Sequence, residues 1–258
     1  MKVYAISDLH VDFPENLDWL AQLSREQYTE DLLILAGDVT DDLELLKRVF
    51  GMLLERFQTV CFVPGNHELW VRGAAYDCSI EKFHAVLAAC EACGVETGCF
   101  RTEHLSVVPL YGWYDFSFGE PDASLKMGWR DFHVCSWPQQ LSTASAVNNY
   151  FLSLNNSRLS EKNQVVISYS HFVPHIELMP DQIPPHKRVV YPVLGSQELG
   201  NQVSRLNPDI HVYGHSHVNQ EKRIGSIKYV NNAFGYPSES RISKKKLHCV
   251  FDSITPQR

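Results

Sequence analysis

The 258-residue sequence has no apolar run long enough to cross a membrane as a helix, which needs about 20 residues. Its first ten residues, MKVYAISDLH, lack the charged, apolar and small-residue regions of a signal peptide. Basic residues are not in excess either, since 23 Lys and Arg stand against 30 Asp and Glu, giving a net charge of -7. We therefore expect a cytoplasmic protein without a membrane partner. Duplex nucleic acid is disfavoured as a partner, although a local positive groove remains open.

Paired cysteine motifs are almost absent. The seven cysteines form an odd set, and reduced thiols are the simplest interpretation for a cytosolic chain. Cys90 and Cys93 make the only CxxC, and they fall in an alanine-rich stretch that predicts a helix ending at Gly94. Because no second CxxC follows, the pattern disfavours a zinc knuckle and favours helix packing.

What the sequence does have is an alternation of apolar runs and helical patterns in its first half. The predicted strands cover 2–7, 31–37 and 59–65, and the predicted helices between and after them cover 15–27, 41–57 and 79–93. Strand–helix alternation at these lengths indicates βαβ crossovers, with helices packed against a sheet. The fold class predicted is therefore α/β.

The second half is less regular. Residues 100–140 are aromatic and predicted to be irregular, and the proline-rich segment 173–192 is predicted to be a loop. Helices are predicted over 143–159 and 196–208, and strands over 164–171, 209–218, 222–233 and 245–252. Since no repeat, low-complexity tract or linker is present, we expect one domain over 1–258.

Polar side chains follow the apolar runs at the point where each run ends. They are Asp8 and His10; Asp38 and Asp41; Asn66, His67 and Glu68; His171; and His215 and His217. In α/β sheets, ligands bind outside the carboxyl ends of the strands. Each group alone is typical of ordinary turn chemistry, and His84, His104, His133 and His248 are interpreted as structural. The convergence of carboxylate, amide and imidazole groups after every buried strand favours a metal site.

The types of donor atom restrict which metal ions could bind and which reaction they could support. Oxygen and imidazole donors without thiolate suit Mn, Fe, Zn or Mg. Seven donors are too many for one such ion and are about right for two ions that share a carboxylate, the common apparatus for in-line displacement at phosphorus. His67 is then surplus to the ligand count and is placed to donate a proton to a leaving oxygen. In a strand, His215 and His217 share a face and could point to two adjacent ions.

The motifs together resemble those of the calcineurin-like metallophosphoesterases. The ordered signature of that family, DxH, GDxxD, GNH[DE], a lone histidine and GHxH, reads here DLH at 8–10, GDVTD at 37–41, GNHE at 65–68, His171 and GHSH at 214–217. The resemblance implies a four-layer α/β/β/α sandwich, in which helices flank two mixed sheets. It also implies a dinuclear metal site along one edge of the sheets.

The resemblance further implies a role for each matching residue. One divalent ion takes Asp8, His10, Asp38 and His217, and the other takes Asp38 as a bridge with Asn66, His171 and His215. A hydroxide between the ions would attack phosphorus in line. His67 would be the general acid, with Asp41 orienting it, and Asn66 would help to stabilise charge on the phosphoryl oxygens.

The same comparison separates this chain from the Ser/Thr protein phosphatases of the superfamily. Those enzymes carry arginine just after GDxxD and another before GNHE, where this chain has Asp42 and Pro64. The main prediction is a metal-dependent phosphomonoesterase that acts on a small organic phosphate. The alternatives are a phosphodiesterase or nuclease that uses the same site, and a catalytically silent scaffold that binds protein partners.

Two variable loops, 111–137 and 172–191, are expected to supply the substrate pocket. The candidate substrate-binding residues are Trp70, Arg72, Trp113, Arg130, His175 and Arg188. Aromatic rings could stack on a base or aryl group, and arginines could pair with a phosphate. The competing interpretation is that the aromatic residues only pack the long loop onto the sheets.

Overall fold

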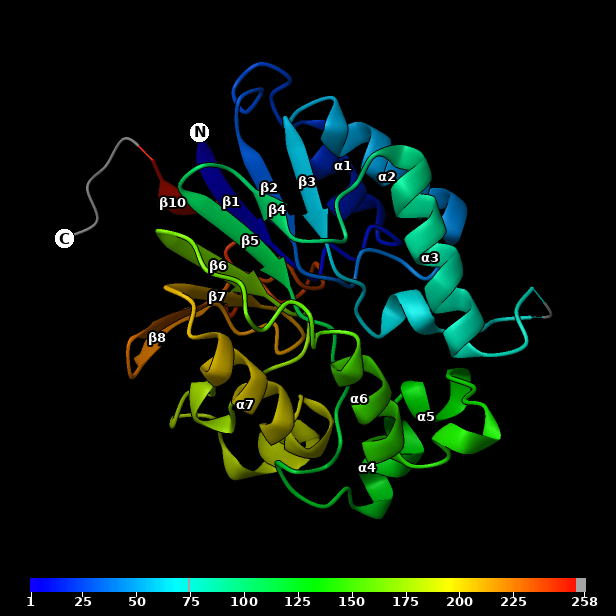
Figure 1. Cartoon of the computed structure of the whole chain (residues 1–258). Helices are drawn as coiled ribbons and strands as arrows, with labels where there is room; N and C mark the ends of the chain where they lie inside the picture. The colour runs from blue at the N-terminus through cyan, green and yellow to red at the C-terminus, as the bar shows by residue number, and fades with distance from the viewer. Residues whose placement is uncertain (74, 254–258) are drawn as a thin grey trace.

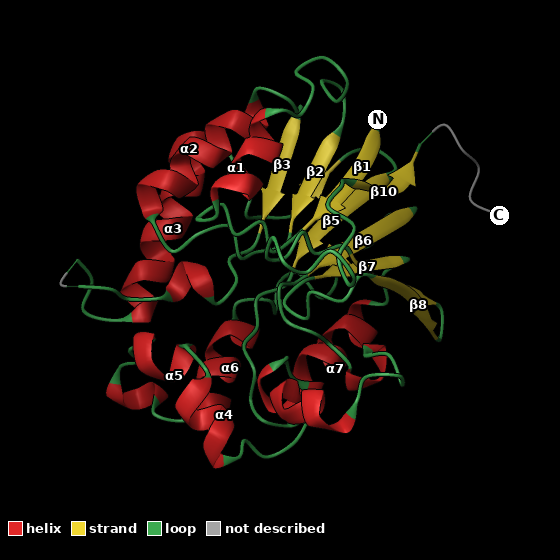
Figure 2. Ribbon diagram, turned by 180° about the vertical axis from the view of Figure 1, so that it is seen from behind, coloured by secondary structure: helices red, strands yellow, loops and turns green. Residues whose placement is uncertain are grey.

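Two mixed β-sheets pack against each other in the computed structural model, which describes residues 1–73 and 75–253. Helices α1–α3 cover the outer side of the first sheet, and α4–α7 lie on the side of the second (Figures 1 and 2). This arrangement confirms the predicted sandwich of two mixed sheets flanked by helices.

The first sheet has the strand order β10-β1-β2-β3. Strands β1 (Lys2–Ile6), β2 (Leu32–Leu35) and β3 (Thr59–Phe62) are parallel, and β10 (His248–Asp252) is antiparallel to β1. Helices α1 (Pro14–Ala21) and α2 (Leu43–Leu54) connect the parallel strands, and α3 (Ser79–Cys93) follows β3.

The second sheet has the strand order β4-β5-β6-β7-β9-β8. Its parallel centre is β5 (Leu105–Pro109), β6 (Val165–Tyr169), β7 (Ile210–Tyr213) and β9 (Ile227–Asn231), with β4 (Phe100–Arg101) and β8 (Gln220–Ile224) antiparallel at the edges. The helices of this half are α4 (Ala123–Gly128), α5 (Asp131–Val134), α6 (Ala144–Ser153) and α7 (Gln197–Leu206). The described residues also form four 3₁₀ helices, one after β3 and three in the second half of the chain. They are η1 (His67–Leu69), η2 (Gln139–Leu141), η3 (Ile176–Leu178) and η4 (Pro185–Val193).

Strand β2 shows why an apolar run forms a strand buried on both faces. Leu32 and Ile34 join the core between the sheets, whereas Leu33 and Leu35 join the core beneath the helices. Successive side chains of a strand point to opposite faces, so a strand covered on both sides must be apolar throughout.

Helix α2 begins directly after the GDVTD motif because Asp42 caps it. The Asp42 carboxylate accepts hydrogen bonds from the backbone N–H groups of Glu44 and Leu45, at 2.8 and 2.9 Å. Such a cap satisfies donors that a helix start leaves free. The motif is thereby held between the end of β2 and the start of the helix.

Several predicted elements differ in extent from the structure. The strand predicted over 209–218 ends at Tyr213, and the segment predicted over 222–233 is a hairpin that turns at Gly225, whose φ is +60°. The segment 100–140, predicted to be irregular, contains β4, β5, α4 and α5, and the proline-rich segment contains η3 and η4. Short runs such as β5, with five residues, carry too little periodicity to be recognised beside an aromatic stretch. No helix among the described residues is long and apolar enough to cross a membrane.

Candidate metal centre

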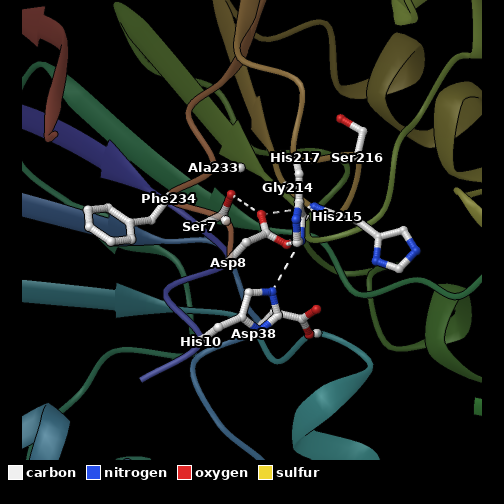
Figure 3. A network of polar contacts seen from close by, with 12 residues as sticks. Ser7, Asp8, His10, Asp38, Gly214, His215, Ser216, His217, Ala233 and Phe234 are labelled. Carbon is white, nitrogen blue, oxygen red and sulfur yellow. Dashed lines mark hydrogen bonds and ion pairs between the residues drawn. The ribbon is translucent and has the colours of Figure 1, made fainter. Parts of the chain in front are cut away.

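The carboxyl ends of five parallel strands deliver polar side chains to one place at the seam of the two sheets. Strands β1, β2 and β3 lead to Asp8, Asp38 and Asn66, and strands β6 and β7 lead to His171 and to His215 with His217. Two contacts close the seam: the His215 N–H donates to Asp8 Oδ1 at 3.1 Å, and a parallel bridge joins Ser7 to Ala233. Figure 3 shows Asp8, His10 and His217 converging there, with Asp38 beside them.

The candidate ligand atoms fall into two neighbouring groups, and a third group of His10, Asp38 and His67 shares one residue with each of them. Asp8, His10 and His217 form one, with His217 Nε2 at 3.2 Å from Asp8 Oδ1 and at 3.1 Å from His10 Nε2. Asp38, His171 and His215 form the other. In it, His171 Nε2 lies 3.5 Å from Asp38 Oδ1 and 3.0 Å from His215 Nδ1. The two groups match the division into two ions that the family resemblance implies.

In three of the histidine ligands, the ring nitrogen that points away from the centre donates a hydrogen bond to a backbone carbonyl or a carboxylate. His171 Nδ1 donates to Ala36 O at 2.9 Å, and His215 Nε2 donates to Val193 O at 3.0 Å. His217 Nδ1 donates to Glu239 Oε2 at 2.6 Å. A neutral ring that donates through one nitrogen leaves the lone pair of the other nitrogen free, so His171 and His215 each present a lone pair to the centre.

Asn66 is fixed in the same way. Its amide nitrogen donates to Asp131 Oδ1 at 2.9 Å, and its Oδ1 lies 3.1 Å from His171 Nε2. Asp131 is buried and also accepts from the indole N–H groups of Trp70 and Trp129, at 2.6 and 2.8 Å. The amide oxygen of Asn66 is therefore directed at the ligand group of His171.

These contacts fit a pair of bound cations. The lone pairs of His171 and His215 face each other across 3.0 Å, which is unfavourable without a positive charge between them. The Nδ1 atom of His10 is buried and has no hydrogen-bond partner among the described residues. Buried polar atoms are normally satisfied, so this unpartnered nitrogen and the two facing lone pairs point to metal ligation.

The charges of the centre are also poorly balanced by the protein alone. Burial raises the pKa of Asp38 well above its usual value, and the neighbouring carboxylates of Glu68 and Asp8 raise it further. Burial opposes a charge on His217, yet the carboxylates of Asp8 and Glu239 outweigh it and raise its pKa to about 10. Burial lowers the pKa of His10, His67 and His215, which keeps these rings neutral. Neutral imidazoles beside repelling carboxylates are the form that binds divalent ions.

The backbone of the ligands is unusual. Eight described residues other than glycine have a positive φ, and five of them are predicted metal ligands: Asp8, His10, Asp38, His215 and His217. The left-handed conformation is unfavourable for residues with a Cβ atom, by roughly 1–2 kcal/mol. Each ligand loop therefore turns sharply just beyond its strand. The sequence had indicated that His215 and His217 are alternate residues of a strand. They lie beyond the end of β7 and reach separate ligand groups through these turns.

Glycine is required at two of the motif positions. Gly37 has a φ of +82°, and a Cβ there would collide with the ring of His171 and the backbone of Gly65. A Cβ on Gly65 would collide with Asp38 Oδ1. The GD and GN pairs thus allow the loops after β2 and β3 to approach each other closely.

Glu68 ties the same two loops together. Its buried carboxylate accepts hydrogen bonds from the backbone N–H groups of Asp38, Val39, Thr40 and Gly65, at 2.6–3.2 Å. Sequence analysis grouped Glu68 with the motif but gave it no role. The structure shows that it fixes the backbone on which Asp38 and Asn66 are mounted.

His67 lies over the ring of Trp70, with the ring centroids 3.6 Å apart. Its Nε2 is 3.7 Å from Asp38 Oδ2, and the side chain lines the cavity next to the ligands. Asp41, predicted to orient His67, forms an ion pair with Arg72, in which Asp41 Oδ2 lies 2.6 Å from Arg72 Nε. Among the described residues no hydrogen bond or ion pair joins Asp41 to His67, so Trp70 is the group that holds the ring here.

A cavity of about 200 Å³ opens beside the ligand groups. Its walls are formed by Asp38, Asn66, His67, Trp129, Val190, Leu194, His215, Ser216, His217, Tyr236 and Glu239. Tyr236 stacks on His10 with ring centroids 4.4 Å apart. Sequence analysis missed Tyr236 and Glu239 because they lie in the loop after β9, where no motif marks them.

None of the six predicted substrate-binding residues lines this cavity. Trp113 is 2% exposed and packs in the core against Trp137 and Phe172, which favours the packing interpretation for the aromatic loop. His175 lies against Tyr229, with the ring centroids 5.5 Å apart.

The other four residues lie behind or outside the wall. Trp70 stacks behind His67, and the guanidinium carbons of Arg72 and Arg130 lie 5.2 and 6.0 Å from the centroid of the Trp70 ring. The guanidinium of Arg188 donates to the backbone carbonyls of Ile183 and Asp181.

We predict that Glu239→Gln weakens metal binding by about 10–100-fold, the usual effect of removing a partner that orients a histidine ligand. Glutamine keeps the size of the side chain but removes the charge that holds His217 in place. Titration of the metal-free protein with Mn²⁺ or Zn²⁺ would measure the change. Glu198→Gln, on α7, is the control, and equal affinities for the two variants would contradict the assignment.

Comparison with known proteins agrees with this site. A model of the calcineurin-like phosphoesterase family matches residues 1–219. The chain is similar to the acyl-carrier-protein phosphodiesterase PptH of Mycobacterium tuberculosis, with 26% identity over 267 residues that cover 94% of this chain and 80% of that protein. It is also similar to the crystal structure of phosphopantetheinyl hydrolase PptH from Mycobacterium tuberculosis. That match has a TM-score of 0.81 and 24% identity, and it covers 100% of this chain and 98% of the other.

The structural likeness extends over the whole fold, and the family match spans every motif from Asp8 to His217. The resemblance drawn from the motifs is therefore confirmed. This chain belongs to the calcineurin-like phosphoesterases, which are metal-dependent phosphoester hydrolases that use two divalent metal ions.

Proposed function

We propose that the chain is a phosphodiesterase that hydrolyses a phosphodiester joining an organic group to a carrier protein. The sequence favoured a phosphomonoesterase and kept the phosphodiesterase as its alternative. The similarity to an acyl-carrier-protein phosphodiesterase supports the alternative. The bond to test first is the one indicated by the two names of PptH, a phosphopantetheinyl group on an acyl carrier protein.

The composition of the cavity wall is the observation in this chain that carries the proposal. No Lys or Arg lines the cavity among the residues that the structure describes. A phosphomonoester is largely a dianion at neutral pH, whereas a phosphodiester carries one negative charge. A dianion needs more positive charge than the diester, and phosphate sites commonly supply it through arginine. A cavity without such cations suits the diester.

The wall also suits an organic group on each side of the phosphorus. Trp129, Val190 and Leu194 give it an apolar part, while Ser216 and Asn66 give it polar atoms. Apolar walls with a few directed polar groups are typical of sites that bind organic ligands.

The polar residues divide the remaining work. Two divalent ions at such a site act as Lewis acids and lower the pKa of water. The Asn66 amide, held by Asp131, would help to stabilise charge on the phosphoryl oxygens. His67, on the cavity wall and held against Trp70, would give a proton to the leaving oxygen once the negative charge of the bound phosphodiester has raised the lowered pKa of its ring.

The test compares diesters with a monoester on protein loaded separately with Mn²⁺, Fe²⁺, Zn²⁺ or Mg²⁺. We expect kcat/KM for bis-p-nitrophenyl phosphate to exceed that for p-nitrophenyl phosphate by at least about tenfold, a difference of about 1.4 kcal/mol. We also expect release of phosphopantetheine from a phosphopantetheinylated acyl carrier protein. Chelation of the metal by EDTA is the control. A preference for the monoester with every metal would overturn the proposal.

A further inference from the structure

Exposed hydrophobic side chains gather around the mouth of the cavity. In the described part of the chain, four large hydrophobic residues are exposed: Phe13, Met127, Val189 and Ile242. Each one adjoins a residue of the cavity wall. The ring centroids of Phe13 and Tyr236 are 5.5 Å apart, and the Ile242 N–H donates to Glu239 O at 3.2 Å. Met127 lies two residues before Trp129 in the chain, and Val189 immediately precedes Val190.

Three of these side chains lie in segments that are strongly basic. Segments 126–130, 186–190 and 241–246 contain eight of the 23 Lys and Arg residues and no Asp or Glu. This concentration occurs in a chain whose net charge is -7. We call these three segments, which carry Met127, Val189 and Ile242, the basic rim.

Several rim cations have no side-chain partner in the described part of the chain. Lys126, Lys187 and Arg241 are exposed, and none has an ion pair or side-chain hydrogen bond among the described residues. By contrast, Arg188 and Lys245 are folded back onto backbone carbonyls. Glu239, the carboxylate next to Ile242, is already bound to His217. The rim therefore presents unpaired positive charge to whatever approaches the mouth.

The position of these cations excludes a direct role at the phosphorus. They belong to the segments that surround the cavity, and none of them lines it. Exposed apolar patches ringed by polar residues mark surfaces that bind macromolecules. Charge at such a rim mainly accelerates association and selects the partner.

We propose that the basic rim is the docking surface for an acidic protein that carries the phosphodiester into the cavity. This inference deepens the proposed function and rests on it, because it names the chemistry of the surface that presents the substrate. The rim cations pair with carboxylates of the partner, and Met127, Val189 and Ile242 pack against apolar side chains between those carboxylates.

The character of the exposed side chains favours a protein over a nucleic acid. Single-stranded nucleic acids bind where exposed aromatic rings stack on successive bases along a positive groove. The three rim hydrophobics are aliphatic or thioether side chains, which pack well on a protein surface and do not stack on bases. The cations also come from three separate segments around an opening and do not follow one continuous groove.

The experiment reverses charge on the rim and at matched positions elsewhere. The rim variant is Lys126→Glu/Lys187→Glu/Arg241→Glu, and the control is Arg48→Glu/Arg205→Glu/Arg223→Glu. The control residues are exposed and lie on α2, α7 and β8, away from the cavity wall. Both triples change the net charge by the same amount. The substrates are a phosphopantetheinylated acyl carrier protein of net negative charge and bis-p-nitrophenyl phosphate.

We expect the rim variant to lose at least about tenfold in kcat/KM on the carrier protein, mainly through KM, because the charge reversals replace attraction to the carrier by repulsion. Activity on bis-p-nitrophenyl phosphate should stay within about twofold of the unmodified protein, since the pairs are remote from the phosphorus. Raising the salt concentration should weaken carrier binding by the unmodified protein and have less effect on the rim variant. The control triple should behave like the unmodified protein.

Binding of the carrier protein, measured separately from turnover, distinguishes the two proposals. If carrier binds and its binding depends on the rim, but neither diester is cleaved, the docking surface stands and the phosphodiesterase proposal fails. If bis-p-nitrophenyl phosphate is cleaved but the carrier protein does not bind at low salt, the docking surface is overturned. Equal losses in both triples, or rim-dependent binding of a single-stranded oligonucleotide in place of the carrier, would also overturn it.

Discussion

Asp38→Ala is expected to bind neither metal ion and to lose activity by more than the roughly 10²–10³-fold that removal of one charge-stabilising group produces. The reason is the position of the carboxylate. Asp38 Oδ1 faces the His171 group, while Oδ2 faces His67, and Asp38 takes part in two of the three candidate clusters. Metal analysis after loading and gel filtration measures the effect directly.

The thermal stability of the metal-free protein should not fall in Asp38→Ala, although metal binding and activity do. The Asp38 carboxylate is buried and repelled by Glu68 and Asp8. Without metal, the variant should therefore unfold at the same temperature as the unmodified protein or at a higher one, while added metal should raise the Tm of the unmodified protein alone. Asp41→Ala is the matched control and should keep both ions, because Asp41 pairs with Arg72. Two ions per chain in Asp38→Ala would refute the shared ligand.

His67→Ala should keep both metal ions and lose turnover according to the leaving group. General acid catalysis typically contributes about 10²–10⁴-fold, and the loss should be near this range when the departing oxygen belongs to an aliphatic alcohol, as in the carrier-protein diester. With bis-p-nitrophenyl phosphate the loss should be much smaller, because p-nitrophenolate leaves without being protonated. The ratio of the two losses is the measurement.

Two observations separate proton donation from a structural role of His67. Metal content and Tm should stay unchanged, since each of the two proposed ions keeps its group of ligands, Asp8, His10 and His217 or Asp38, His171 and His215, without His67. His84 lies on α3 and hydrogen-bonds to the Tyr150 hydroxyl on α6. His84→Ala should leave the turnover of both substrates unchanged. Equal losses on the two substrates would show that His67 stabilises charge or positions the substrate and does not donate the proton.

The sequence predicts the fold well, and it places the proposed ligands at strand ends for the same physical reason. Strands buried on both faces read as continuous apolar runs, so their ends can be located, and Asp8, Asp38 and His171 stand at those ends. The carboxyl ends of parallel strands meet at one edge, which brings together residues separated by two hundred positions. The matched family then fixes the sandwich, whose second sheet was only partly visible in the sequence.

The remaining parts of the site come from loops without periodicity. Asp131 and Glu239 orient Asn66 and His217, yet they lie in segments where no strand end or motif marks them. Their roles depend on where the loops fold, which is decided by tertiary contacts and not by local pattern. Trp113 shows the converse, since an aromatic residue that suggested a substrate contact is a core residue at 2% exposure.

The left-handed backbone at five of the ligands has a consequence for how such a protein can change over evolutionary time. The backbone at Asp8, His10 and Asp38 is strained, and the buried carboxylates of Asp8 and Asp38 repel each other, costs that a pair of bound ions would offset. A descendant that lost Asp38 would remove the repulsion and gain stability as a metal-free protein, whereas the strain at the turns would persist with any residue that has a Cβ atom. Loss of metal would therefore favour replacement of the buried carboxylate, with glycine as the replacement that also relieves the backbone.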